Sequence, residues 1–170
     1  MGYGTLGWLG ELLSWGLRET DLHGIELDAE RARVAQQAFP SADLRVGDAT
    51  ALPWESACFR LVVVSTVFSS VLDPVVCNLL AREIERVIAP GGGLLFYDFA
   101  VNNPANDQVR GVPRGEVLRL FPDLRGEVRA VTLAPPLARA IAPWSWTLAT
   151  CLEAVPFLRT HLVAVLSKHE

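Results

Sequence analysis

Positive charge, cysteine and long apolar runs are all scarce in this sequence. The 170 residues carry a formal net charge of −4 at pH 7, with arginines scattered along the chain. Because nucleic-acid binding needs a dominant basic patch, we expect no nucleic-acid partner. Cys58, Cys77 and Cys151 are too widely spaced for a disulfide framework or a zinc site, and we expect them to be small buried residues. No metal ligand set is expected either, since the histidines have no partner at metal-binding spacing.

The longest nearly apolar run, residues 61–72, contains three serines and one threonine and is too short to cross a bilayer. The first residues do not show the basic and apolar regions of a signal peptide. We therefore expect a cytoplasmic protein without a membrane span. With 51% hydrophobic and 20% charged residues, the composition predicts a single globular domain over residues 1–170.

Apolar strand patterns and helical patterns alternate along the chain. This order predicts an α/β fold, a Rossmann-like doubly wound and mostly parallel sheet with helices on both faces. In such sheets, ligands bind beyond the carboxyl ends of the strands. The irregular stretch 101–116 is expected to be a long functional loop. The expected strands are 21–27, 43–46, 59–65, 91–99, 128–133 and 161–167, and the expected helices are about 8–16, 28–39 (capped by Asp28), 73–89 (capped by Asp73) and 137–152.

The chain opens on a glycine motif that is typical of nucleotide-binding turns. Residues 2–7, GYGTLG, match the G-x-G-x-x-G pattern, in which glycines let the backbone approach a ligand at a helix N-terminus. Glu26 ends a predicted strand 24 positions after Gly2, where a carboxylate can accept the ribose hydroxyls of an adenine nucleoside. Asp48 follows the next strand and can accept from an adenine amine. The glycine motif and Glu26 fit either a nicotinamide nucleotide or S-adenosylmethionine, whereas Asp48 is one of the downstream features that separate the two.

The glycine turn, HGIELD, GDATALP and EIERVIAPGGGLLFYD occur in the order found in class I S-adenosylmethionine-dependent methyltransferases. The chain resembles this family, especially its broad bacterial type 11 group. The resemblance implies that the protein transfers a methyl group from S-adenosylmethionine to a small-molecule acceptor, which it does not identify. The residues expected to contact the cofactor are Gly2, Tyr3 and Gly4 at the methionine moiety, Glu26 at the ribose, Leu27, Asp48 and Ala49 at the adenine, and Ser65 near the methionine part.

Several polar residues follow the strand whose carboxyl end should face the methyl group. We expect acceptor contacts from Tyr97, Asn102, Asn103 and Arg110, with turn formation as the alternative for the two asparagines. Asp98 is the candidate general base, which only a hydroxyl acceptor would need.

The chain departs from the family pattern at its start and in one strand. The third glycine of the turn falls at Gly7, one place late, and Phe59-Arg60 stands where the family usually has Phe-Asp. No strand precedes the glycines, which predicts an N-terminally shortened domain with a gap between the strand ending at Glu26 and residues 61–64. The gap could stay open, close by direct pairing, or accept a strand from another chain and so create an oligomer. Two other functions stay open, a Rossmann-type nicotinamide-dependent oxidoreductase and a non-catalytic methyltransferase-like remnant.

Overall fold

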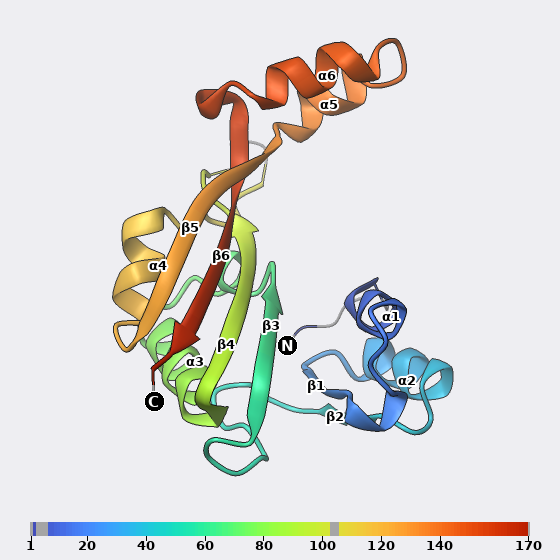
Figure 1. Ribbon diagram of the computed structural model, residues 1–170, viewed down its shortest axis with the longest axis vertical. Helices are drawn as coiled ribbons and strands as arrows, with labels where there is room; N and C mark the ends of the chain where they lie inside the picture. The colour runs from blue at the N-terminus through green and yellow to red at the C-terminus, as the bar shows by residue number, and fades with distance from the viewer. Residues whose placement is uncertain (1, 3–6, 103–105, 170) are drawn as a thin grey trace.

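The strands form two separate sheets in the computed structural model, which describes residue 2, residues 7–102 and residues 106–169. The smaller sheet is the parallel pair β1 and β2. The larger has the order β3-β4-β6-β5, in which β3 and β4 are parallel and β6 is antiparallel to both β4 and β5 (Figure 1). The strands are β1 His23–Glu26, β2 Asp43–Val46, β3 Phe59–Ser65, β4 Ile88–Phe99, β5 Leu124–Leu133 and β6 Arg159–Lys168.

The helices begin where the sequence offers capping side chains. Asp28 accepts from the Arg31 N–H at 2.9 Å, and Asp73 accepts from the Val75 N–H at 2.7 Å, so both predicted N-caps are confirmed. The helices are α1 Gly7–Ser14, α2 Ala29–Ala38, α3 Pro74–Val87, α4 Arg114–Leu120, α5 Pro135–Ile141 and α6 Trp146–Glu153, with short 3₁₀ turns at Glu19–Asp21, Phe68–Ser70 and Pro156–Leu158.

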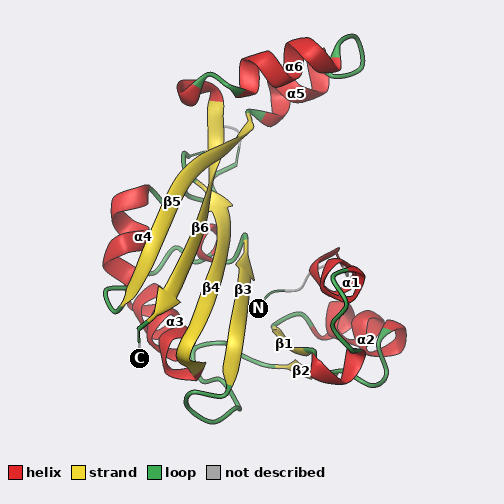
Figure 2. Ribbon diagram, in the orientation of Figure 1, coloured by secondary structure: helices red, strands yellow, loops and turns green. Residues whose placement is uncertain are grey.

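The main core lies between one face of the larger sheet and the helices α3 and α4 (Figure 2). Phe68, Phe96 and Phe121 meet there with ring centroids 5.5 to 6.2 Å apart, and Ile84 of α3 is fully buried beside them. Each such side chain contributes roughly 1.5 to 3 kcal/mol when buried. A second core joins α1 and α2 to the smaller sheet and contains Leu9, Leu22, Ala32, Ala35 and Leu44.

The two sheets do not hydrogen-bond to each other through strand pairing in the part of the chain that the structure describes. Direct pairing of β1 with β3, one of the expected outcomes, is therefore not what the structure has. The sheets are instead joined by side chains: the ring of His23 lies 6.0 Å from that of Trp54 and 5.2 Å from that of Phe59. Ile25 also shares a small core with Leu52 and Val87.

Three expectations about local structure were wrong. The single helix over 137–152 is two helices, because the chain turns at residues 142–145 and Ser145 caps α6 by accepting from the Leu148 N–H. The irregular stretch 101–116 runs into α4, which begins at Arg114. Cys58 and Cys151 are exposed, and only Cys77 is buried.

The helices α5 and α6 form a hairpin that projects from the ends of β5 and β6 (Figure 1). This α5–α6 hairpin exposes 90% of Trp144 and 77% of Trp146. Among the described residues, no helix combines the length and the apolar character needed to cross a membrane.

Candidate functional site

Two predicted acids lie at the carboxyl edge of the smaller sheet. Glu26 is the last residue of β1 and is only 7% exposed, and its Oε1 accepts from the Asp28 N–H at 3.2 Å. The Gly47 N–H donates to the Glu26 carbonyl at 3.0 Å, which holds the end of β2 beside it. Asp48 comes next and is exposed, with Oδ1 accepting from the Thr50 N–H at 2.8 Å. The parallel pairing of β1 with β2 thus brings Glu26 and Asp48 to one edge.

Gly2 contacts both β1 of the smaller sheet and the loop that follows β3 of the larger sheet. Its N–H donates to the Ile25 carbonyl in β1 at 3.0 Å. Its φ is +57°, and a Cβ at this position would stand 2.7 Å from Cγ2 of Val67, in the loop after β3. Only glycine meets both demands without strain. Tyr3 and Gly4, the other predicted residues of this turn, lie outside the described residues.

The remaining predicted cofactor residues differ in exposure. Leu27 is 75% exposed, whereas Ala49 is partly buried and packs against the core. Ser65 ends β3 opposite Tyr97 of β4. Thr66, directly after it, has a φ of +52°, an unusual value for a β-branched residue, and its N–H donates to the Tyr97 carbonyl at 2.8 Å. Backbone strain of this kind is concentrated at functional sites. The sequence contains no pattern that predicts the positive φ of Thr66.

Tyr97 belongs to a cluster that the sequence did not reveal. Its hydroxyl lies 3.1 Å from Oγ1 of Thr132, a residue with a φ of +64°. Its ring stacks on that of His161 at 5.1 Å, and His161 is only 5% exposed. Burial lowers the pKa of His161, so its neutral form is favoured. The antiparallel pairing of β4 with β6 places His161 opposite Phe99, and this long-range register leaves no short-range pattern in the sequence.

Asp98 is fully buried, and its carboxylate is occupied by backbone donors. Oδ2 accepts from the Ser69 N–H at 3.1 Å and Oδ1 accepts from the Phe99 N–H at 2.9 Å. Burial raises the pKa of Asp98. These contacts hold the 3₁₀ turn Phe68–Ser70 against β4. A methyl-acceptor molecule that enters from solvent does not reach this buried carboxylate. The environment therefore argues against the expected role of Asp98 as general base.

Two acceptor-side candidates make structural contacts instead. Arg110 donates to both carboxylate oxygens of Glu116 at 2.8 Å and to the Val71 carbonyl at 3.1 Å, and Glu116 raises the pKa of Arg110. Asn102 accepts from the Gly111 N–H at 2.7 Å, which agrees with the turn-forming alternative. Asn103 lies outside the described residues.

The segment that follows Asp48 is anchored by a charged pair on α3. Glu83 accepts from the Leu52 N–H at 2.8 Å. Arg86 donates to the carbonyls of Leu52 at 3.0 Å and Trp54 at 2.8 Å, and to both oxygens of Glu83 at 2.8 Å. This contact was also missed, since an Arg three residues after a Glu on a helix ordinarily predicts a solvent-exposed pair.

A family model of a methyltransferase domain, type 11, matches residues 1–96, more than half of the chain. The chain belongs to this methyltransferase family. The match covers the predicted glycine turn, Glu26, Asp48 and Ser65, and it ends within β4. No curated protein matches the sequence.

Solved structures agree on the fold. An S-adenosylmethionine-dependent methyltransferase from Methanosarcina mazei superposes with a TM-score of 0.69 at 17% identity, covering 99% of this chain and 90% of that one. One from Mesorhizobium loti gives 0.68 at 15% identity, covering 98% and 88%. Geranyl diphosphate C-methyltransferase from Streptomyces coelicolor, in complex with Mg²⁺, geranyl diphosphate and S-adenosyl-L-homocysteine, gives 0.67 at 15%, covering 98% and 68%. The expected Rossmann-like methyltransferase fold is therefore confirmed.

Proposed function

We propose that this methyltransferase domain binds S-adenosylmethionine at the carboxyl edge of β1, β2 and β3 and transfers its methyl group to a small molecule. The observation that carries the proposal is the bond from the Gly2 N–H to the carbonyl of Ile25, the residue directly before Glu26 at the end of β1. Gly2 has a positive φ and a close contact with Val67 that a side chain would not tolerate, and Glu26 supplies a carboxylate at the end of the strand to which Gly2 is hydrogen-bonded.

The residues present suit the chemistry of this cofactor. Glu26 would accept the two ribose hydroxyls, and Asp48 with the backbone of Ala49 would hold the adenine amine and ring edge. Gly2, Tyr3, Gly4 and Ser65 would hold the methionine moiety, and Leu27 would cover the adenine. When bound, the cofactor supplies an activated methyl group on a sulfonium. The protein then acts mainly by orienting the acceptor, an effect worth ~7 kcal/mol or more in well-positioned reactions.

On the acceptor side we favour Tyr97, because its hydroxyl lies at the carboxyl end of β4 with the Thr132 hydroxyl as its neighbour. Asn102, Asn103 and Arg110 remain weaker candidates, since the contacts described for Asn102 and Arg110 are structural. A cytoplasmic location remains a prediction from the composition.

Calorimetric titration with S-adenosylmethionine tests the proposal. Glu26→Ala should weaken binding by roughly 2 kcal/mol, about 30-fold, because it removes a charge-assisted acceptor. Glu30→Ala is the matched control, since Glu30 is an exposed acid on α2 that pairs with Arg33. Equal affinity in wild type and Glu26→Ala would refute the ribose assignment. Stabilisation by NADH, and not by S-adenosylmethionine or S-adenosylhomocysteine, would favour the oxidoreductase alternative.

A further inference from the structure

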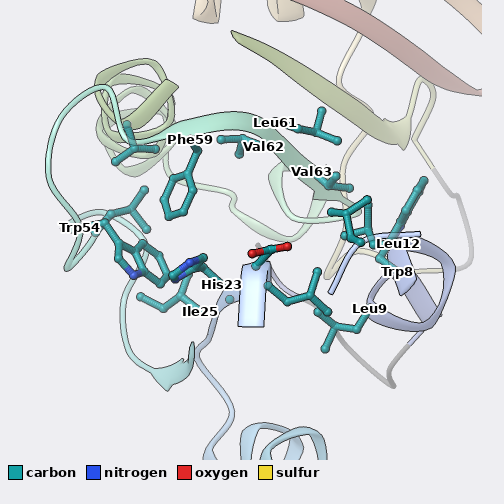
Figure 3. A pocket seen from close by; sticks show the side chains of 16 residues that line it. Trp8, Leu9, Leu12, His23, Ile25, Trp54, Phe59, Leu61, Val62 and Val63 are labelled. Atoms are coloured by element: carbon teal, nitrogen blue, oxygen red, sulfur yellow. The ribbon is translucent and has the colours of Figure 1, made fainter. Parts of the chain in front are cut away.

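The larger sheet ends in β5, a strand of 10 residues that has one open edge. Within the described part of the chain, β5 pairs with β6 and with no other strand. The other outer strand, β3, faces the smaller sheet across the pocket shown in Figure 3, which Phe59 and Val63 line together with Ile25. Beside residues 128–131 of β5 there is instead a groove of about 620 Å³, with α6 on its far side. Because consecutive residues from both faces of β5 line this groove, it lies along the open edge.

The ladder between β4 and β6 fixes the direction of the main-chain groups in β6. The Ala100 N–H donates to the Thr160 carbonyl at 2.8 Å, in register with the antiparallel pairing of these two strands. Main-chain groups of successive residues point to opposite sides of a strand, so the even-numbered residues of β6 point toward β4. The odd-numbered residues of β6 therefore point toward β5.

The same alternation continues into β5. The odd-numbered residues of β6 stand opposite the odd-numbered residues of β5 over 125–131, which therefore direct their main-chain groups back to β6. The residues between them, Gly126, Val128 and Ala130, turn their main-chain groups to the open edge. The Ala130 carbonyl agrees with this direction, because it accepts from Nη1 of the Arg159 side chain at 3.1 Å.

The side chains on either side of Val128 carry opposite charges. Glu127 and Arg129 form an ion pair with each other, and their side chains are 68% and 70% exposed. Charged side chains on an open edge usually prevent a second strand from pairing there. Here an antiparallel copy of β5 centred on Val128 places Glu127 of each copy opposite Arg129 of the other. These are non-hydrogen-bonded positions of the new ladder, where opposite Cα atoms are about 4.5 Å apart and side chains are closest.

Neighbouring registers are less favourable. Moving the centre by one residue places Glu127 opposite Glu127, or Arg129 opposite Arg129, so that like charges meet. A shift that pairs Glu127 with Arg125 leaves only residues 124–128 of β5 in contact, because the strand begins at residue 124. The register centred on Val128 combines attractive charges with the longer overlap.

We propose that the open edge of β5 is a self-association surface, on which a second copy of this chain adds its own β5 antiparallel, with Glu127 of each copy opposite Arg129 of the other. Val128 then exchanges main-chain hydrogen bonds with Val128 of the second copy, and Gly126 exchanges them with Ala130. The dimer has one continuous sheet of order β3-β4-β6-β5-β5-β6-β4-β3. Its contact is narrow, so association is weak and depends on protein concentration.

Sedimentation equilibrium of the full chain between about 5 and 500 μM tests this surface, and the wild type should dimerise in that range. Glu127→Arg and Arg129→Glu should each weaken dimerisation at least ~10-fold, because like charges then meet at both pairs. A mixture of the two variants should recover the wild-type affinity to within ~3-fold, and the double variant should do the same. Glu30→Arg and Arg33→Glu, in an exposed ion pair on α2, are the matched controls and should leave dimerisation unchanged.

Hydrogen exchange followed by NMR gives a second measurement. The amides of Gly126 and Val128 should exchange at least ~3-fold more slowly at high than at low protein concentration, whereas those of Glu127 and Arg129, which point to β6, should not change. A wild type that stays monomeric would overturn the proposal. So would a dimer that both single variants retain, since another surface would then form it.

Failure of the mixture to associate would also overturn the proposal, because the charges would then act only through the ion pair between Glu127 and Arg129 within one chain. Neither the sedimentation nor the exchange measurement uses S-adenosylmethionine. Both therefore decide on the dimer independently of the proposed methyl transfer.

Discussion

Arg86 should contribute measurably to the stability of the fold. It donates to two carbonyls of the segment that follows Asp48 and forms a two-pronged pair with Glu83. Its side chain is 31% exposed, so each carbonyl bond is counted at about 1 kcal/mol, below the usual range for charged donors. The helical ion pair adds about 0.5 kcal/mol. Arg86→Ala should therefore lower the free energy of unfolding by roughly 2.5 kcal/mol, which corresponds to a fall in Tm of about 5 to 10 °C.

Urea unfolding followed by circular dichroism measures this change. Arg86→Lys should be only about 1 kcal/mol more stable than Arg86→Ala. One ammonium group cannot replace the several N–H donors of the guanidinium, which bond to two carbonyls and a carboxylate. Arg82→Ala, at an exposed position on the same helix, is the control and should change stability by less than about 0.5 kcal/mol. If Arg86→Ala and Arg82→Ala unfold at the same urea concentration, the anchoring role assigned to Arg86 is wrong.

The pair also predicts a pH dependence with a definite sign. Arg86 lowers the pKa of Glu83 below its ordinary value of 4.5. A lowered carboxyl pKa gives stability that is present above about 4.5 and is lost as pH falls through the pKa of the folded state. The difference between wild type and Arg86→Ala should therefore be larger at pH 7 than at pH 3. An unchanged difference at the two pH values would contradict the charge contribution.

Further substitutions centred on Gly2, Gly126 and Asp98 test other parts of the structure. Gly2→Ala should cost about 1 to 2 kcal/mol in thermal unfolding, and Val67→Ala in the same protein should restore part of it, because the contact at 2.7 Å is with a flexible side chain. Gly126→Ala should cost roughly 3 kcal/mol, since a Cβ there would overlap the Val165 carbonyl oxygen. Asp98→Ala should cost about 2 to 3 kcal/mol by leaving two backbone donors without their acceptor, while Asp98→Asn should keep methyl transfer within about threefold of wild type if Asp98 is not the base.

Local features of the structure were predictable because their causes are local. The caps at Asp28 and Asp73 depend on a side chain and a backbone N–H two or three residues away, and both were identified from sequence. The apolar run at 59–65 is a strand as expected. Glu26 lies at a strand end because the pattern of apolar residues stops there.

The features that escaped prediction depend on contacts between distant segments. The stacking of His161 on Tyr97 requires the antiparallel register of β4 and β6, which joins residues more than sixty positions apart. The burial of Asp98 depends on which face of β4 the helices cover. The break between α5 and α6 was within reach of sequence reasoning, because Pro143 and Ser145 are ordinary signals for the end of one helix and the start of the next.

The tryptophans of the α5–α6 hairpin and the tryptophan at the junction of the sheets differ in exposure, so their fluorescence should differ as well. Trp144 and Trp146 stand in solvent on the hairpin, whereas Trp54 is packed between His23 and Phe59 where the two sheets meet. The hairpin tryptophans should emit at longer wavelength and be quenched readily by iodide, leaving a shielded component that includes Trp54. With Trp8, Trp15, Trp144 and Trp146 all replaced by phenylalanine, the emission of Trp54 alone would follow events at the junction of the sheets, without a label attached to the chain.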